Sequence, residues 1–552
     1  MKTANPRKRI LLSGVFGPFG VDDAYGRKEN IMELFHNQVT KAQGPASFRF
    51  HHRSFGLYFL AANVDADVTV LDFPSRRRFI REIKKGYDIV GISFITPNFI
   101  KAREMARLVR LHAPHSKIVL GGHGAAIEGL ERLIDCDEIA RGEGIRWLRS
   151  FLGQDPEAPV FHPALPSAQL MKIFGVPLFG KSASLLVPGL GCVNGCKFCC
   201  TSHFFGRTYT PYLATGKELF ETACRIADER KNNDFFVMDE NFLKDRERAL
   251  ELLECIERER KPYTFGIFSS AETLHSLGDL DALVRLGVQF VWIGVESKRD
   301  TYTKNRGTDF HEVIRELRRR GIAVMASAIL FLEHHDPKSI WEDIDYAVSL
   351  EPDYLQFMQL GPMPGTALHD AYLRAGKMLE DVPYSERHGQ DQIWFRHPEF
   401  TRASSRAFLK AAFQRDYRHG GASLLRNIDT VLRGYRYALE HTDPRVRRRA
   451  ETFVLLRQMR LFLPAARLLA ANRVTADMAK RLESEYRALF GRRSAKDLAA
   501  IAGVTFLAAL EWAKTRFMGD VRQPGRNLMR YRWPEIEERA AGSMSPALAR
   551  QA

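Results

Sequence analysis

The strongest constraint on the fold is the alternation, over the first 150 residues, of short apolar runs with stretches of helical periodicity. The runs are continuous rather than alternately polar, which is typical of parallel strands buried on both faces. Between two of them, residues 99–111 repeat their apolar side chains near helical spacing. This pattern predicts a doubly wound α/β domain over residues 1–152. The predicted strands are residues 9–15, 68–73, 88–93, 117–120 and 138–140.

Small residues follow the predicted strands where such sheets bind ligands, beyond the carboxyl ends of the strands. The loops contain Gly14 and GPFG at 17–20, SFITPN at 93–98, GGHG at 121–124 and RGEG at 141–144. Glycines let backbone approach a large, flat or phosphate-bearing ligand closely. Glycine after a strand is also ordinary turn chemistry, so no single loop decides the matter.

A second block of alternating elements spans residues 181–380. Six strand-like runs with helical stretches between them predict a partial (β/α)6 barrel, with its active site at the carboxyl ends of the strands. Residues 153–180 contain five prolines and predict a linker. Residues 381–552 lose the strand pattern and predict a basic, α-helical C-terminal domain. The predicted barrel strands are residues 185–187, 235–238, 265–268, 290–293, 324–331 and 354–358.

The cysteines are too few for a disulfide framework, since four of the seven fall within nine residues. Cys192, Cys196 and Cys199 form C-x3-C-x2-C directly after the first predicted barrel strand. Three thiolates on one loop can hold three irons of a four-iron cluster and leave the fourth iron open to another ligand. A closed zinc site is the alternative, and it needs a fourth ligand from Cys200 or His203. Clustered cysteines indicate a reducing compartment, so we expect a cytoplasmic protein.

The charge is uneven along the chain. The net charge is +16, and residues 401–552 contain 30 Lys/Arg against 14 Asp/Glu, so the first 400 residues are balanced. A basic region can face nucleic acid, an anionic membrane or an acidic substrate. No nucleic-acid motif appears, so nucleic acid is not favoured. Residues 445–472 mix arginines with leucines, which predicts either peripheral membrane contact or a helix packed on the barrel with its arginines outward. No run reaches the roughly 20 apolar residues of a spanning helix.

The cysteine loop, with the aromatic Phe198 before its last cysteine, resembles the signature of the radical S-adenosylmethionine (SAM) superfamily. The resemblance implies that Cys192, Cys196 and Cys199 hold a [4Fe-4S] cluster and that SAM chelates the open iron through its amino and carboxylate groups. It further implies that an electron cleaves SAM to a 5′-deoxyadenosyl radical, which abstracts hydrogen. Cys200 lies outside the pattern and is expected to be a spectator.

Three later segments resemble SAM-binding motifs of the superfamily, in the expected order. MDENF at 238–242 follows the second strand, where the family recognises the methionine amine, and a carboxylate facing an ammonium is sensible pairing. SSAE at 269–272 resembles the segment that contacts ribose and carboxylate, and GVES at 294–297 the motif near adenosine. Helix capping and turn chemistry are the alternatives. The implied SAM contacts are Asp239, Glu240, Ser269, Glu272 and Glu296.

The doubly wound domain ahead of the barrel resembles the cobalamin-binding (B12-binding) subgroup of this superfamily, over residues 8–375. No D-x-H-x-x-G motif follows the first strand, and cobalamin commonly binds in this subgroup without that histidine. His123 is expected near the nucleotide tail rather than on cobalt. A vestigial domain without cofactor is the alternative. The implied cobalamin contacts are Gly17, Ser93, Thr96, Gly121, Gly122, Gly142 and Gly144.

The resemblance implies a methyltransferase: the radical removes a substrate hydrogen, methylcobalamin supplies the methyl group, and a second SAM remethylates cobalt. Two alternatives stay open, a cobalamin-dependent radical cyclase, rearrangement or oxidation enzyme, and a non-catalytic cobalamin- or metal-binding protein. The expected partners are a small-molecule or lipid-like substrate and an external electron donor such as flavodoxin or ferredoxin. Cys136, Cys224 and Cys255 are isolated, so a second cluster is not expected.

Overall fold

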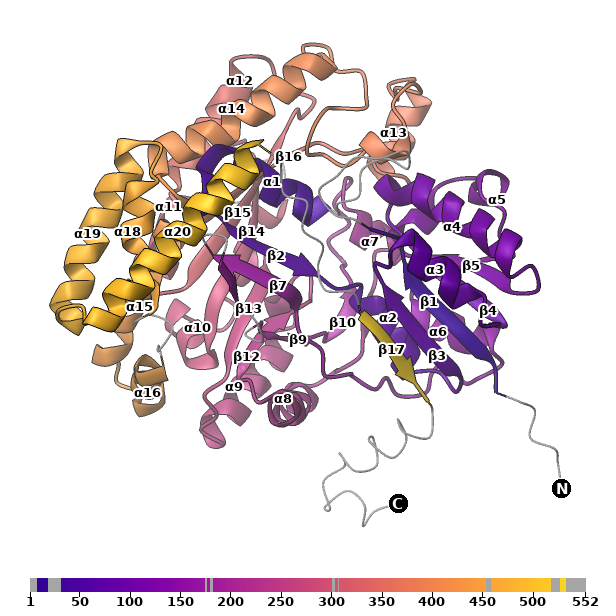
Figure 1. The fold of residues 1–552 in the computed structure, drawn as a ribbon, viewed down its shortest axis with the longest axis horizontal. Coiled ribbons are helices and arrows are strands. Elements are labelled where there is room, and N and C mark those ends of the chain that lie inside the picture. The colour runs from indigo at the N-terminus through magenta and orange to yellow at the C-terminus, as the bar shows by residue number, and fades with distance from the viewer. Residues whose placement is uncertain are drawn as a thin grey trace.

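The computed structural model describes residues 7–17, 31–173, 176–178, 182–299, 303–305, 307–452, 458–517 and 527–532. The N-terminal domain, the barrel and the C-terminal helices follow one another across the molecule (Figure 1). The predicted GPFG loop after the first strand lies outside the described residues, except for Gly17.

The N-terminal domain is built on a six-stranded sheet that contains all five predicted strands in parallel. Successive residues of its central strand face opposite sides, as the strand period of two requires. Leu11 packs with α3 (Arg76–Ile83) and α4 (Phe99–His112), and its neighbours pack with α2 (Phe55–Ala62) and α6 (Gly144–Phe151). Helices therefore cover both faces, as predicted. In sheet order the strands are β17 (Asn527–Tyr531), β3 (Asp67–Asp72), β1 (Arg9–Gly14), β4 (Ile89–Ser93), β5 (Lys117–Gly121) and β6 (Glu138–Ile139).

Two features of this half of the molecule were not predicted. β17, from near the C-terminus, pairs antiparallel with β3 and lies beside it in Figure 1. Residues 153–180 contain β7 (Ala168–Ile173) and β8 (Val176–Leu178), which form a separate antiparallel sheet with β2 (Phe48–His52). β17 pairs with β3, and β7 pairs with β2, across long stretches of sequence, so no local pattern predicts these pairings. Only β7 and β8 are neighbours in sequence.

The second domain has all six predicted parallel strands, each paired with the next in sequence. The sheet order leaves the first and last strands at its edges, which is the arrangement of a partial barrel. Helices α8 (Gly216–Arg230), α9 (Arg246–Arg258), α10 (Leu280–Leu286), α11 (Phe310–Arg319) and α12 (Ser339–Ser349) connect successive strands. The strands are β9 (Ser184–Leu186), β12 (Asp234–Val237), β13 (Thr264–Ser269), β14 (Val288–Glu296), β15 (Ala323–Leu330) and β16 (Tyr354–Gln359).

Local sequence explains why these helices form where they do. In α11, Asp309 caps the first turn by accepting a hydrogen bond from the Glu312 amide. Phe310, Ile314 and Leu317 recur at helical spacing and are buried against the barrel strands. The apolar face therefore fixes which side of the helix meets the sheet.

The C-terminal region is helical, as predicted, apart from β17. Helices α14 (Arg402–Gly420) and α15 (Ser423–Glu440) pack on α11, α12 and β16. An outer layer of α18 (Leu463–Leu468), α19 (Arg473–Phe490) and α20 (Ala495–Phe517) shares its own apolar core with α15 (Figure 1). No helix in the described parts of the chain is long and apolar enough to cross a membrane.

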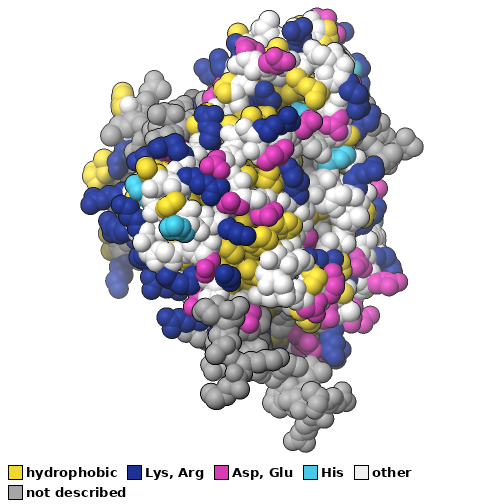
Figure 2. Space-filling model, turned by 90° about the vertical axis from the view of Figure 1, so that its right-hand side faces the viewer, with side chains coloured by type: hydrophobic (Ala, Val, Ile, Leu, Met, Phe, Trp, Pro, Cys, Tyr) yellow, Lys and Arg dark blue, Asp and Glu magenta, His cyan; other side chains and the backbone are white. Residues whose placement is uncertain are grey.

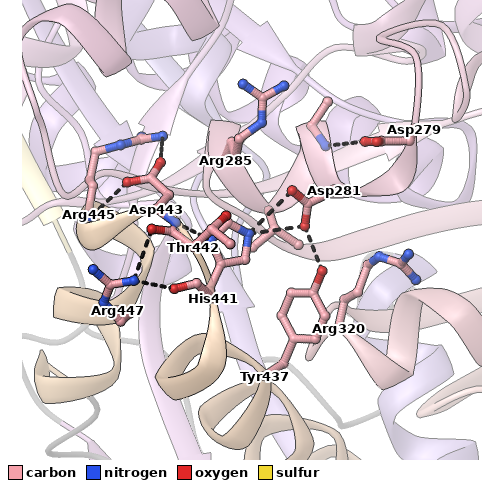
Figure 3. Close-up of polar contacts among 12 residues, drawn as sticks. Asp279, Asp281, Arg285, Arg320, Tyr437, His441, Thr442, Asp443, Arg445 and Arg447 are labelled. Carbon is pink, nitrogen blue, oxygen red and sulfur yellow. Dashed lines mark hydrogen bonds and ion pairs between the residues drawn. The ribbon is translucent and has the colours of Figure 1, made fainter.

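Polar contacts seal the junction between α15 and α10 (Figure 3). The Tyr437 hydroxyl donates a hydrogen bond of 2.6 Å to Asp281, and the His441 Nε2 atom lies 3.1 Å from the same carboxylate. The Arg447 guanidinium donates to the His441 carbonyl at 2.5 Å. Asp281 is thus the barrel's anchor for the end of α15.

The first part of the basic segment 445–472 packs on the barrel, but not with all its arginines outward, and the part from Met459 onward packs with the outer helices. Arg445 and Arg449, in α16 (Pro444–Thr452), are buried. Arg449 donates hydrogen bonds to the carbonyls of Val284 and Arg285, at 2.5 and 3.1 Å. These carbonyls lie in the last turn of α10, where the helix dipole makes a cation favourable. Part of the segment, residues 453–457, lies outside the described residues.

Candidate functional site

The three motif cysteines lie on one loop that is fixed at both ends. The loop runs from β10 (Gly189–Gly191), which pairs with β11 (Tyr209–Pro211), to α7 (Cys200–Phe204). The Ser202 hydroxyl donates a hydrogen bond of 2.7 Å to the Cys192 carbonyl and accepts one from the Gly195 amide. The Ser202 side chain of α7 therefore fixes the first half of the loop.

Cys192, Cys196 and Cys199 line one cavity of about 400 Å³ at the carboxyl ends of the barrel strands. Burial raises the pKa of each thiol, that of Cys199 to about 12. Such thiols are protonated at neutral pH unless a metal ion stabilises the thiolate. Three partly buried thiols without a disulfide on one loop suit an iron–sulfur cluster. Cys200 lines the same cavity.

Of the two predicted SAM contacts that follow β12, only Glu240 lines this cavity. Burial raises the pKa of its carboxyl, and a hydrogen bond with Thr201 counteracts this in part. Its neighbour Asp239 is already engaged: Tyr209 and Arg248 donate to its carboxylate at 2.7 and 2.8 Å. The structure thus gives the two adjacent acids different surroundings.

Glu296 lies at the cavity wall in a backbone conformation that side chains rarely adopt, with φ of 66°. Its carboxylate forms a buried salt bridge of 2.5 Å with Lys304. Burial acts to lower the pKa of Lys304, but the attraction of Glu296 outweighs it and the pKa lies above its ordinary value. A Cβ at Gly294 would lie 2.2 Å from the Glu296 carboxylate and 2.8 Å from the Lys304 ammonium, so a side chain there would displace this ion pair. Strain held in place at a cavity wall is typical of functional sites.

Lys304 was missed by sequence reasoning. It follows Glu296 by eight residues in a stretch without a recognisable motif, and only the fold brings its ammonium into the cavity beside the cysteine loop.

The other two predicted SAM contacts, Ser269 and Glu272, lie in different places. Ser269 lines the cavity, and its hydroxyl lies 2.9 Å from that of Thr273. Glu272 does not line the cavity and instead forms a salt bridge of 2.8 Å with Lys244 near the surface. The SSAE segment therefore brings only its first part to the cavity.

A second cavity, of about 470 Å³, lies between the N-terminal domain and the barrel. On the N-terminal side it is lined by the predicted Ser93, Gly121, Gly122, Gly142 and Gly144. Gly17 and Thr96, also predicted, do not line it. Across the cavity, Tyr212 donates a hydrogen bond to Glu143, which joins the two domains.

The lining of this second cavity suits a large ligand approached by backbone. Gly122 has φ of 81°, and a Cβ there would lie 2.6 Å from the Phe94 carbonyl. His123 is half-buried, and desolvation lowers its pKa to about 4, so it is neutral. Its Nδ1 atom has no hydrogen-bond partner within the protein, and its ring packs against Phe204 at 4.7 Å between centroids. A corrinoid, with its many amide groups, fits both the glycine cradle and the unsatisfied histidine.

The two cavities adjoin. Glu240 and Phe268 line both cavities, so these two side chains form a wall that the cavities share.

Comparison with known families resolves what the two domains are. Residues 46–151 match the model of the B12 binding domain, and residues 186–347 match that of the radical SAM superfamily. The chain joins a B12-binding domain to a radical SAM domain. The predicted subgroup is thereby confirmed, as are the predicted cofactors, a [4Fe-4S] cluster, SAM and cobalamin.

Two curated relatives and one solved structure resemble this radical SAM chain. The hopanoid C-2 methylase of Rhodopseudomonas palustris is 23% identical over 201 residues, which are 35% of this chain and 38% of the relative. The bacteriochlorophyllide d C-12(1)-methyltransferase of Chlorobaculum tepidum is 26% identical over 323 residues, 54% of this chain and 69% of the relative. The match thus spans well under half of the first relative.

The solved structure is the radical SAM methyltransferase TsrM from Kitasatospora setae, determined with tryptophan and a SAM analogue. It is 16% identical, covers 82% of this chain and 100% of its own, and superposes with a TM-score of 0.51. At this identity the likeness shows the fold, which is the predicted α/β architecture with a helical C-terminal region.

Proposed function

We propose that this radical SAM enzyme transfers a methyl group to an unactivated carbon of a small molecule, with cobalamin as the methyl carrier. The observation that carries the proposal is the common wall of the two cavities, formed by Glu240 and Phe268. A methyl donor in one cavity and a radical generator in the other would face the same substrate. Both curated relatives are named as methylating enzymes, which supports the reaction class.

The bound cofactors supply the radical and the methyl group, and the protein supplies position and exclusion of water. In this proposal Cys192, Cys196 and Cys199 hold the cluster. Glu240 faces the methionine ammonium, because a carboxylate that lines a cavity is best satisfied by a cation. Trp292 and Trp394 line the same cavity and shield it from water.

The Glu296–Lys304 salt bridge is proposed to fix one side of the SAM site. Its two side chains are mostly buried, with 7% and 17% of their surface exposed. Lys304 would therefore present a positive charge close to the cluster loop without moving.

The substrate is proposed to be a small, lipid-like molecule. The names of the relatives specify a hopanoid and a bacteriochlorophyllide, and the solved structure holds tryptophan, so small molecules are the common class. An external one-electron donor such as flavodoxin or ferredoxin completes the proposal. Peripheral membrane contact of the C-terminal region would bring the enzyme to a lipid-like substrate.

The test is anaerobic reconstitution with iron, sulfide and cobalamin, followed by reduction and addition of SAM with a deuterated methyl group. Methylation predicts S-adenosylhomocysteine together with deuterated methylcobalamin, even without substrate, and 5′-deoxyadenosine from radical cleavage. Deoxyadenosine alone would favour a cyclase, rearrangement or oxidation enzyme. Bound cobalamin with neither product would indicate a binding protein.

The residue assignments are tested separately. Cys192→Ala, Cys196→Ala and Cys199→Ala should each abolish the cluster absorbance and SAM cleavage, whereas Cys136→Ala, distant in the N-terminal domain, should change neither. Glu240→Gln should lower SAM affinity, and Glu272→Gln, at the Lys244 salt bridge, should not. Retention of cluster and cleavage in the three cysteine variants would refute the radical SAM assignment of this loop.

A further inference from the structure

Helix α20 exposes an unusual amount of apolar surface in the described structure. Six of the fifteen large apolar side chains that are exposed among the described residues lie on this one helix. Phe506 and Phe517 are 64% and 78% exposed. A helix that is apolar all round belongs in a core or against an apolar phase, so the exposed face of α20 calls for a partner. The six are Leu498, Phe506, Leu507, Leu510, Trp512 and Phe517.

The exposed side chains form a stripe along the helix. Leu498, Phe506, Leu510 and Phe517 are separated by eight, four and seven residues, which keeps them on one face. At 1.5 Å per residue the stripe is about 29 Å long. The opposite face, including the fully buried Ala508, packs on the outer helical layer.

Charges flank the stripe but do not interrupt it. Lys496 and Lys514 are exposed near the ends, and Arg492 is exposed just before the helix. Asp497 is engaged by Arg460 at 2.8 Å, and Glu511 is buried. Between the two lysines the exposed surface carries no charged side chain.

We infer that this face of α20 is a membrane-contact surface, which lies in the interfacial region of a bilayer that contains anionic lipids. Apolar side chains in the plane of the interface with cations at the margin are the pattern of an interfacial helix. A protein partner is less suited to this stripe, because lysine is depleted in protein–protein interfaces and lysines flank the stripe near both ends. A second copy of the chain would set the same lysines and arginine against one another, in a region with an excess of 16 positive charges after residue 400.

The proposed membrane contact lies on α20 and not on the segment that the sequence predicted. The segment 445–472 was expected to supply it, yet Arg449 donates to the Val284 carbonyl and Arg445 forms a salt bridge with Glu257 of the barrel. By contrast, the face viewed in Figure 2 shows basic and acidic side chains intermixed. The contact therefore belongs to one helix rather than to the basic region as a whole. It does not depend on which reaction the enzyme catalyses.

The test is sedimentation of the full-length protein with vesicles of phosphatidylcholine, with or without one quarter phosphatidylglycerol. We expect binding to the anionic vesicles, and Phe506→Asp/Phe517→Asp should lower the partition coefficient at least about tenfold, since each phenylalanine loses apolar burial. Leu111→Asp, at an exposed leucine on α4, is the matched control and should bind as wild type. Lys496→Gln/Lys514→Gln should weaken the preference for phosphatidylglycerol.

Phe506→Ser/Phe517→Ser repeats the test without adding charge, and thermal melting checks that each variant is folded. Absence of wild-type binding, or equal binding by the serine variant and wild type, would overturn the inference. A wild-type dimer that the α20 variants convert to monomer, without vesicle binding, would assign the face to a second copy instead. Either result would leave the product analysis for methylation untouched.

Discussion

Two junctions join the barrel to its neighbours, one with the N-terminal domain and one with the C-terminal helices, and different groups fill them. The first encloses a cavity of about 470 Å³ lined by glycines, apolar side chains and an unsatisfied histidine. The second is closed by direct hydrogen bonds: Arg426, held by Asp416 of the preceding helix at 2.7 Å, donates to the Asp353 carbonyl of the barrel at 3.2 Å, and Thr430 donates to the Asp353 carboxylate at 2.6 Å. The first junction therefore leaves room for a ligand, whereas direct contacts in the second hold the C-terminal helices against the barrel.

The largest expected effect comes from breaking the closed junction. Asp416→Ala leaves the buried Arg426 without its partner, which should cost about 3–5 kcal/mol of unfolding free energy. Asp345→Ala, which breaks the half-exposed salt bridge with Arg415, should cost less than about 1 kcal/mol. Denaturant unfolding measures both. Equal losses in the two variants would show that the buried pair stabilises the fold no more than an exposed pair does.

The open junction can be tested without damaging the fold. Gly142 lines the cavity, and a Cβ there meets no atom within 4 Å, so Gly142→Leu should fill ligand space. Gly153 is the control, because it has a similar positive φ and open surroundings but lies outside the cavity. Both variants should lose about 1–2 kcal/mol of stability from backbone strain.

Only Gly142→Leu should also weaken cobalamin binding, by about tenfold or more, a change of at least 1.4 kcal/mol. Equilibrium titration by absorbance gives the affinity. Identical affinities in the two variants would place cobalamin elsewhere.

The smallest effect concerns the pH dependence of the closed junction. Burial acts to raise the pKa of Asp281, but hydrogen bonds from Tyr437 and His441 outweigh it and hold the pKa below its ordinary value. A lowered pKa in the folded state stabilises the fold above the unfolded value of about 3.9, and this contribution is lost as the pH falls through the folded pKa.

The difference in unfolding free energy between wild type and Asp281→Asn should therefore be greatest near neutral pH and shrink in acid. Urea unfolding across this range measures it, with Asp345→Asn as the exposed control. A difference that stays constant from neutral to acid pH would contradict the role given to Asp281.

The sequence by itself determined the elements whose signals are local. Continuous apolar runs predicted five strands of the first sheet and all six of the barrel, because strands buried on both faces need apolar side chains at every position. The C-x3-C-x2-C spacing predicted the cluster loop, since ligands on one short loop converge whatever surrounds them. The helical C-terminal region was likewise predicted from a local signal, its composition.

Only the tertiary structure decided what depends on distant partners. β17 pairs with a strand more than 450 residues earlier, and Arg449 is directed to the last turn of a helix in another domain. Of the adjacent acids in MDENF, Asp239 is bound by Arg248 and Tyr209 while Glu240 faces both cavities. The sequence alone does not distinguish these two carboxylates. The packing does, because burial and the nearest charge differ for each.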